Sequence, residues 1–199
     1  MTTTIDLIKD YVKKYAEIYG YKVPDAIIAQ AVTESGINGS GLSKNYFNFW
    51  GMKDGPGWTG KTVTLKTREE YVKGVLTPIY AKFRVYENVE SGVIGYFEFL
   101  KSYKRYADVI NATSVEDFAE KIRSAGWATS FTYRESIIKN YHKYVENLDT
   151  KPVVKDKTPV IDAVKNLQTK LNDFGSYGLA VDGIIGPKTT EAYNNFKRS

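Results

Sequence analysis

One stretch of the sequence decides how the fold is interpreted: residues 29–53, AQAVTESGINGSGLSKNYFNFWGMK. An apolar run over residues 27–32 predicts a buried helix that carries Glu34 near its end, and Ser35–Gly36 predicts the stop. The helix dipole disfavours a negative charge at that end, and apolar neighbours raise the pKa of a carboxyl group. Glu34 is therefore a candidate general acid, the alternative being a helix-end carboxylate that stays in solvent.

A second carboxylate is generally needed when a carboxylic acid cleaves a glycosidic bond, unless the substrate supplies a group instead. Over residues 55–86, apolar residues such as Val63 and Leu65 alternate with polar ones, and Gly and Pro mark turns, which predicts an antiparallel hairpin. Glu69 and Glu70 lie in this segment. Adjacent side chains on a strand point to opposite faces, so we expect at most one of the two to face a cleft.

Helical patterns flank the hairpin on both sides. The first has Thr4 as its predicted N-cap and Gly20 as its stop, and a later one begins at Ser114, which with Asp117 resembles a capping box. The sequence therefore predicts a mostly α domain with a small β-hairpin lobe, an α+β fold in which a cleft separates two lobes.

The pattern breaks at residues 148–159, where two prolines and alternating charges predict a linker. We therefore expect one domain over residues 1–147 and a small module over residues 160–199, whose last helix begins at Pro187. A module of this size has little core and is usually a binding unit.

The composition restricts the chemistry. The chain has 199 residues, no cysteine and a single histidine, His142, which excludes a thiol nucleophile and a metal site built on cysteine or several histidines. No Gly-x-Ser-x-Gly elbow precedes His142, so a Ser-His-Asp triad is not expected. Aromatic residues make up 14% of the chain, which fits either a site for flat sugar faces or an aromatic-rich core.

The net charge of +5 is spread along the chain. Residues 1–148 hold 20 Lys+Arg against 17 Asp+Glu, and residues 149–199 hold 8 against 6. Without a basic tract, nucleic-acid binding is not expected, whereas general attraction to a polyanionic surface such as a bacterial wall, a membrane or RNA is compatible. The N-terminal residues show no apolar stretch of the signal-peptide kind, and no segment approaches a membrane span.

Residues 29–53 resemble the opening motif of the glucosaminidase family of peptidoglycan hydrolases. The family shows Ala-Gln-Ala-x-x-Glu-(Ser/Thr)-Gly and then Asn-x-(Phe/Trp)-Gly-(Ile/Met)-Lys. The matching residues here are Gln30, Glu34, Gly36, Asn48, Trp50, Gly51 and Lys53. The likeness covers roughly residues 20–145 and implies a lysozyme-like fold. The segment VDGIIGPKT near the C-terminus is similar to the hallmark turn of a small three-helix peptidoglycan-binding domain.

The resemblance also implies roles for individual residues. Glu34 would be the catalytic acid, and Glu70, which precedes Tyr71, would be the second carboxylate, with Glu69 as the alternative. Tyr133 would be the family's catalytic tyrosine, although its segment GWATSFTYRE departs from the family's Gly-Tyr-Ala-Thr-Asp-Pro-x-Tyr. The implied substrate-binding residues are Gln30, Asn48, Trp50, Trp127 and Thr129, of which Trp127 would stack on a sugar. The implied wall-binding residues are Asp182, Gly183 and Tyr193. The family needs neither metal nor cofactor.

The expected function is that of an endo-β-N-acetylglucosaminidase that cleaves the GlcNAc-β-1,4-MurNAc strand of peptidoglycan. The alternatives are a muramidase or lytic transglycosylase on the same substrate, and a non-catalytic wall-binding protein. A phage endolysin is the expected setting: a monomer made in the host cytoplasm without a signal peptide, which reaches the wall after the membrane is breached. No nucleic acid and no stable membrane association are expected.

Overall fold

The computed structural model describes residues 2–72, 74–146, 159–181 and 183–198. The chain divides into two compact units, Met1–Lys151 and Pro152–Ser199. The boundary between the units falls inside the predicted linker, residues 148–159, which up to residue 158 lies outside the described residues.

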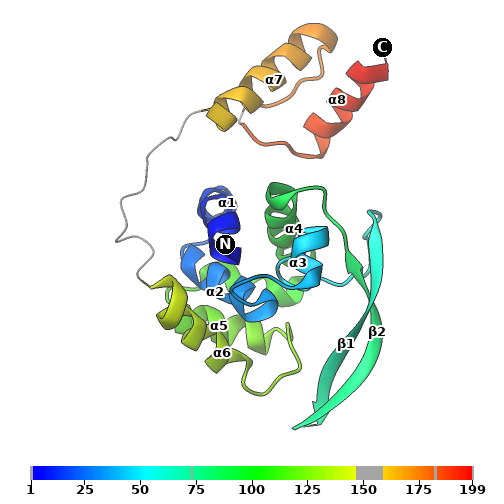
Figure 1. Ribbon diagram of the computed structural model, residues 1–199. Coiled ribbons are helices and arrows are strands. Elements are labelled where there is room, and N and C mark those ends of the chain that lie inside the picture. Colours follow the sequence, from blue (N-terminus) through cyan, green and yellow to red (C-terminus); the bar gives the residue numbers. More distant parts are fainter. Residues whose placement is uncertain (1, 73, 147–158, 182, 199) are drawn as a thin grey trace. The chain divides into compact units, whose positions relative to one another are not determined.

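The first unit combines a group of helices with one two-stranded antiparallel ribbon (Figure 1). The helices are α1 (Thr4–Tyr19), α2 (Pro24–Ser35), α3 (Gly41–Tyr46), α4 (Val89–Ser102), α5 (Val115–Ser124) and α6 (Tyr133–Asn140). Short helical turns are η1 (Lys104–Tyr106), η2 (Val109–Asn111) and the π-helical η3 (Tyr141–Val145). The ribbon consists of β1 (Thr62–Val72) and β2 (Val75–Arg84). This is the predicted α+β architecture.

Helix α2 is the centre of the unit. Eight of its twelve residues are buried, and it contacts α1, α5, α6 and η3. Burying an isoleucine such as Ile27 or Ile28 stabilises a fold by roughly 1.5–3 kcal/mol, so the apolar run fixes this helix in the core. Pro24 occupies the first turn, and Gly36 ends the helix at a φ of 72°, as the sequence predicted.

The N-cap of helix α1 lies one residue earlier than predicted. The N-cap is Thr3, whose hydroxyl accepts from the Asp6 amide while the Asp6 carboxylate accepts from the Thr3 amide. The prediction of Thr4 as N-cap was wrong, because the Thr4 hydroxyl donates instead to the Gly36 carbonyl at 2.8 Å. Thr4 thus joins the start of α1 to the end of α2, close to Glu34.

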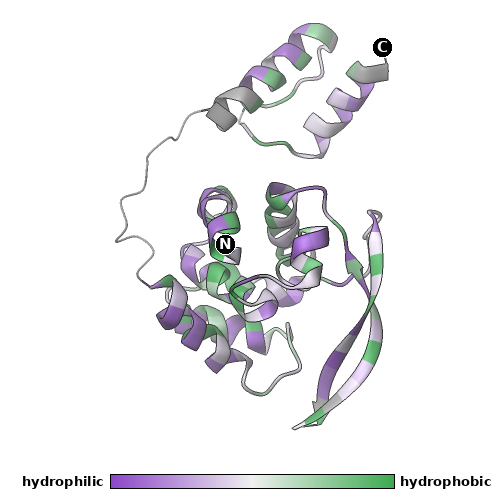
Figure 2. Ribbon diagram, viewed as in Figure 1, coloured by the Kyte–Doolittle hydropathy of each residue, from purple (hydrophilic) through white to green (hydrophobic). Residues whose placement is uncertain are grey.

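The ribbon has the predicted alternation. Val63 pairs with Phe83 and Leu65 with Ala81, and the register shifts between Glu69 and Val72. Hydrophobic and hydrophilic residues both occur along the two strands (Figure 2), and Val72 and Tyr80 are 63% and 74% exposed. The ribbon is therefore anchored to the helices through part of its length and is solvated elsewhere.

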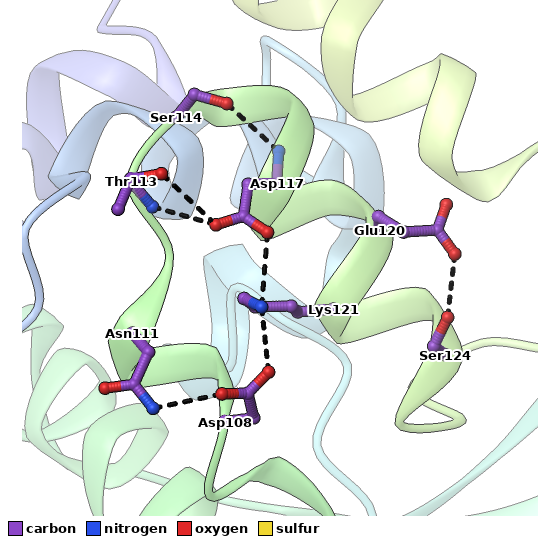
Figure 3. Close-up of polar contacts among 8 residues, drawn as sticks. All are labelled: Asp108, Asn111, Thr113, Ser114, Asp117, Glu120, Lys121 and Ser124. Carbon is purple, nitrogen blue, oxygen red and sulfur yellow. Dashed lines mark hydrogen bonds and ion pairs between the residues drawn. The ribbon is translucent and has the colours of Figure 1, made fainter.

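A polar cluster fixes the start of α5 (Figure 3). The Ser114 hydroxyl accepts from the Asp117 amide at 3.1 Å, which confirms the predicted cap, but the Asp117 carboxylate accepts from the Thr113 amide instead of completing a box. Lys121 links Asp117 to Asp108, at 3.2 and 2.8 Å. These contacts fix the N-terminal end of α5 and join it to η2 through Asp108 and Asn111.

The second unit contains α7 (Pro159–Gly175) and α8 (Pro187–Arg198). Its described residues form two helices where the resemblance implied three, since the residues between them include Gly178 and Gly183 at positive φ and Pro187 starts only the last helix. The small core is made by Leu171, Leu179 and Ala192.

Candidate active site

An open cleft of about 700 Å³ lies between the helical lobe and the ribbon. The helical lobe contributes the end of α2, the loop before β1, part of η1 and the loop between α5 and α6, and the ribbon contributes residues 65–70 of β1. Glu34, Glu69, Glu70, Trp127, Thr129 and Tyr133 all line it. The predicted cleft between two lobes is present, and it brings both candidate carboxylate sources to one site.

Glu34 is held through one of its two oxygens. The Tyr133 hydroxyl donates to Oε1 at 2.5 Å, and the Trp127 indole N–H donates to the same oxygen at 2.8 Å. Within the described part of the chain, no group donates a hydrogen bond to Oε2. This oxygen lies beside Gly51, where an added Cβ would be 3.6 Å from Oε2. The two oxygens therefore differ, one fixed by the protein and one left to the cleft.

The environment makes Glu34 a weak acid. The pKa of Glu34 is raised to about 7, with burial as the largest cause and the charge of Glu69 as a further one that raises it. The hydrogen bonds from Tyr133 and Trp127 lower the pKa because they stabilise the ionised form. The balance leaves a substantial protonated fraction near neutral pH, as a general acid requires.

A second layer orients Tyr133. The Gln30 amide donates to the Tyr133 hydroxyl at 3.0 Å, and the Tyr96 hydroxyl donates to Gln30 Oε1 at 2.6 Å. Burial raises the pKa of Tyr133 and of Tyr96 well above the ordinary value, so both phenols stay protonated. Gln30 is fully buried and positions Tyr133, and its predicted contact with substrate stays a prediction.

Asn48 and Trp50 are also buried, both with 0% exposure. The Asn48 side chain bonds both the amide and the carbonyl of Met52 and the carbonyl of Arg84, which shapes the loop beside Glu34. The Trp50 indole donates to the Ile27 carbonyl and stacks on Tyr96 at 4.3 Å. The polar groups of Asn48 and Trp50 are used inside the core, Trp50 also borders the cleft, and substrate contact by these two residues stays a prediction.

Trp127 and Thr129 lie on the loop between α5 and α6. The Trp127 ring packs among Tyr96, Phe99 and Tyr106, with centroids 5.4–5.6 Å apart, and its N–H is used by Glu34. Trp127 is partly exposed in the cleft, so a sugar contact stays a prediction. Thr129 is exposed and reaches across the cleft to the ribbon.

The two glutamates of β1 differ in what they bind. The Glu69 carboxylate accepts from Lys53 Nζ at 2.5 Å and from the Thr129 hydroxyl at 2.9 Å, and its side chain is 15% exposed. The Glu70 carboxylate accepts from the Gly74 amide at the hairpin turn, and only its backbone N–H reaches Thr129, at 3.1 Å. Glu69 is also the carboxylate whose charge acts on Glu34. The geometry therefore favours Glu69 over the expected Glu70.

Several residues of this site escaped sequence reasoning. Tyr96 carried no signal of its own, since buried tyrosines are common, and Gly51 was noted only as part of the family motif. Lys53 was noted only as part of a motif, and its carboxylate partner could not be assigned without the fold. Arg105, which also lines the cleft, was not singled out.

The wall-binding predictions fall on the second unit. Asp182 lies outside the described residues. Gly183 is buried and its amide donates to Gln168 Oε1 at 2.9 Å, and its contact with the wall stays a prediction. Tyr193 on α8 is 37% exposed.

Two further properties hold for the described residues. Within 2–72, 74–146, 159–181 and 183–198, no three His, Cys, Asp or Glu side chains are grouped as a metal site would require. None of the helices in these ranges is long and apolar enough to cross a membrane.

Comparison with known proteins follows the same division. Residues 9–146 match the family described as glucosaminidase, mannosyl-glycoprotein endo-beta-N-acetylglucosaminidase. This chain belongs to the glucosaminidase family. The resemblance expected from residues 29–53 is thereby confirmed. Residues 161–199 match the peptidoglycan-binding domain family, as expected from the VDGIIGPKT turn.

Individual relatives are similar over more than half of the chain. Peptidoglycan hydrolase FlgJ of Escherichia coli is 34% identical over 115 residues, which are 56% of this chain and 36% of FlgJ. The chain thus matches about a third of the length of this curated relative. A peptidoglycan hydrolase mutant from a Sphingomonas species has a similar structure, with a TM-score of 0.60, 26% identity, and coverage of 69% of this chain and 90% of that one.

The glycoside hydrolase domain of Salmonella typhimurium FlgJ is similar as well. Its C-terminally truncated structure has a TM-score of 0.52 and 27% identity, with 70% of this chain and 94% of that chain covered. Both structural relatives are covered almost completely, so the likeness concerns a whole folded domain.

Proposed function

We propose that the first unit is an endo-β-N-acetylglucosaminidase that hydrolyses the GlcNAc-β-1,4-MurNAc strand of bacterial peptidoglycan. One observation carries the proposal: Glu34, with a pKa near 7, faces the cleft with one oxygen fixed by Trp127 and Tyr133 and the other free. Family membership and the hydrolases among the structural relatives support the same reaction.

In the proposed mechanism, Glu34 is the general acid and its proton resides on Oε2. Oε1 already accepts two hydrogen bonds, so the remaining oxygen is the one able to present a proton to the cleft. The proton moves to the bridging oxygen, the bond from the sugar C1 to that oxygen breaks, and the bridging oxygen keeps the electron pair. The sugar ring gains oxocarbenium character, as in other glycosidases.

Glu69 is the proposed second carboxylate, in place of the expected Glu70. It would take the proton of the water that attacks C1, or support the 2-acetamido group of the substrate if that group attacks first. Its bonds to Lys53 and Thr129 hold it at the cleft, whereas Glu70 is used at the hairpin turn. Tyr133 would keep Glu34 oriented and stay protonated while it does so.

We further propose that the second unit binds the wall and raises the local concentration of the catalytic unit on its substrate. Its match to the peptidoglycan-binding domain family supports this role. A catalytic unit paired with a wall-binding unit suits a phage endolysin that acts after membrane breach. Expression in a bacterial host tests that setting. Lysis is expected when the chain is co-expressed with a membrane-permeabilising protein, and no lysis is expected when the chain is expressed alone.

The test of the reaction is digestion of purified, peptide-stripped peptidoglycan by the full chain and by Glu34→Gln. Fragments are reduced with borohydride and analysed by mass spectrometry. Reduced N-acetylglucosamine ends are expected from the full chain, with a loss of about 10²–10⁴-fold in rate in the variant. Reduced muramic acid ends would identify a muramidase, and anhydro ends a lytic transglycosylase. No fragments from either protein would leave a wall-binding protein.

A further inference from the structure

We propose that Arg105 forms a carboxylate-binding subsite in the cleft. The carboxylate would come from the substrate, either from the peptide attached to muramic acid or from the lactyl group of a strand without peptide. The inference rests on the proposed function, because it requires a peptidoglycan strand in the cleft beside Glu34.

Arg105 is placed where such a strand would pass. It belongs to η1 and lines the same cleft as Glu34, with its side chain exposed. A Cβ added at Gly126 would lie 3.9 Å from one of its guanidinium nitrogens. The guanidinium therefore lies beside the start of the loop that carries Trp127, one residue further along the chain.

Aromatic rings hold the guanidinium. Its central carbon lies 4.7 Å from the ring centroid of Tyr106 and 5.6 Å from that of Tyr103. Tyr106 is buried and packs against Trp127, which donates to Glu34. A continuous series of contacts thus connects Arg105 to the catalytic acid. A hydrogen bond to Tyr106 uses part of the guanidinium edge, and these contacts reduce the entropy lost when the remaining N–H donors bind a carboxylate.

Four cations of the described residues line the cleft: Lys66 and Arg68 on β1, Lys53 in the loop before it, and Arg105 on η1. Lys53 is paired with Glu69. Arg84, next to the cleft loop, donates to the backbone carbonyls of Lys53 and Asp54. Within the part of the chain that the structure describes, no carboxylate lies within ion-pair distance of Arg105. Arg105 is therefore an oriented fork of donors on the helical side of the cleft, and a carboxylate is the group that such a fork binds bidentately.

This subsite has a consequence for specificity. Peptidoglycan strands carry a lactyl group on every muramic acid, with or without a peptide, whereas a neutral glycan offers no carboxylate. A charge-assisted, bidentate hydrogen bond in a cleft contributes enough binding to change kcat/KM by about 10- to 100-fold. Arg105 would thus favour the acidic strand over a neutral one of the same backbone.

The experiment compares three substrates made from one peptidoglycan preparation. The first is strands with peptides, the second is strands stripped of peptides by an amidase, and the third is stripped strands whose lactyl carboxylates have been converted to amides. The full chain, Arg105→Gln and Arg105→Lys are measured on each for kcat/KM. Lys104→Gln is the matched control, since Lys104 is an exposed cation of the same turn that does not line the cleft.

We expect Arg105→Gln to lose about 10- to 100-fold on a carboxylate-bearing substrate and less than about twofold on the amidated strands. A loss on stripped strands assigns the lactyl carboxylate, and a loss confined to strands with peptides assigns the peptide. Arg105→Lys, which keeps the charge and loses the fork, should lie between, and Lys104→Gln should match the full chain. Equal losses on all three substrates, or no loss on any, would overturn the subsite.

The outcomes distinguish a failure of the subsite from a failure of the proposed function. If the full chain releases no fragments from any of the three substrates, the proposed function fails and the subsite falls with it. If the full chain cleaves all three and Arg105→Gln changes none of the rates, only the subsite fails. Thermal unfolding of each variant identifies a loss of fold, and Arg105→Lys then serves as the readable variant.

Discussion

The two sides of the cleft present their carboxylates in opposite ways. Glu34 ends a helix with eight of twelve residues buried, and its Oε1 is fixed by two side chains from another part of the fold. Glu69 lies on a two-stranded ribbon, and its oxygens are held by Lys53 and Thr129, which are both exposed. One group is embedded in the core, and the other depends on contacts at the surface.

The difference indicates a division of labour. An acid must be weak and oriented before the substrate arrives, and only a packed environment both raises a pKa and fixes a geometry. Surface ion pairs such as Lys53–Glu69 contribute roughly 0–1 kcal/mol, so the ribbon carboxylate can change partners when a glycan enters. The helical side is preorganised, and the ribbon side is adjustable.

The largest expected effect concerns which ribbon glutamate takes part. Glu69→Gln should lower kcat by about 10²–10⁴-fold, because it removes the carboxylate that faces Glu34 across the cleft. Glu70→Gln should lower it by less than about threefold, since the Glu70 carboxylate accepts from the Gly74 amide at the turn, which an amide oxygen can also do. Initial rates on peptide-stripped strands measure both.

The two variants control one another, because each replaces one carboxylate oxygen by an amide nitrogen at neighbouring positions. If Glu70→Gln were the slower enzyme, the second carboxylate would be the one the sequence indicated, and the ribbon would have to shift on substrate binding. If both variants kept their activity, neither carboxylate would be needed, and the 2-acetamido group of the substrate would attack C1 without a second carboxylate.

The helical side was largely predictable from the sequence, and the ribbon side was not. The end of α2, the stop at Gly36 and the approach of Tyr133 to Glu34 follow from local pattern or family resemblance, because they depend on residues near in sequence or on a shared motif. Strand alternation predicts that one of Glu69 and Glu70 faces inward, but it does not say which one. The choice follows from the hydrogen bond between Glu69 and Thr129, which lies 60 residues further along the chain.

Burial shows what three of the predicted site residues do within the fold. Gln30, Asn48 and Trp50 belong to the motif that identifies the family, and a motif does not separate residues that touch substrate from residues that hold those that do. Each of them has its polar atoms bonded inside the protein. A buried polar group must find such partners, so motif residues in a tightly packed region are as often supports as contacts.

The next effect is on stability and follows from the pKa of Glu34. That pKa is raised from 4.5 to about 7 in the folded chain, so between these pH values the unfolded chain binds fewer protons than the folded one. The free energy of unfolding should therefore fall as pH rises from about 4.5 to about 7, by roughly 3 kcal/mol at most from this group. Above that range the loss should be complete.

Urea unfolding at several pH values, with Glu34→Gln as the partner, measures this loss. The amide oxygen of the variant can still accept from Trp127 and Tyr133, so the difference in unfolding free energy isolates the titration. The variant should gain stability relative to the full chain as pH rises from about 4.5 to about 7. A flat difference for Glu34→Gln would mean that the acid is not embedded as described.

The smallest effect tests how the embedded acid is tuned. Trp127→Phe removes the indole N–H that stabilises ionised Glu34, so the pKa of Glu34 should rise further, by about one unit. The basic limb of the pH profile of kcat/KM should move upward by the same amount, with about a tenfold loss in rate because Oε1 is held by Tyr133 alone. Trp58→Phe is the matched control, since the Trp58 indole donates to the Lys61 carbonyl and does not line the cleft. A loss of rate with an unmoved pH profile would assign Trp127 to sugar contact. The helical side would then depend on the substrate, instead of being fully preorganised before the substrate binds.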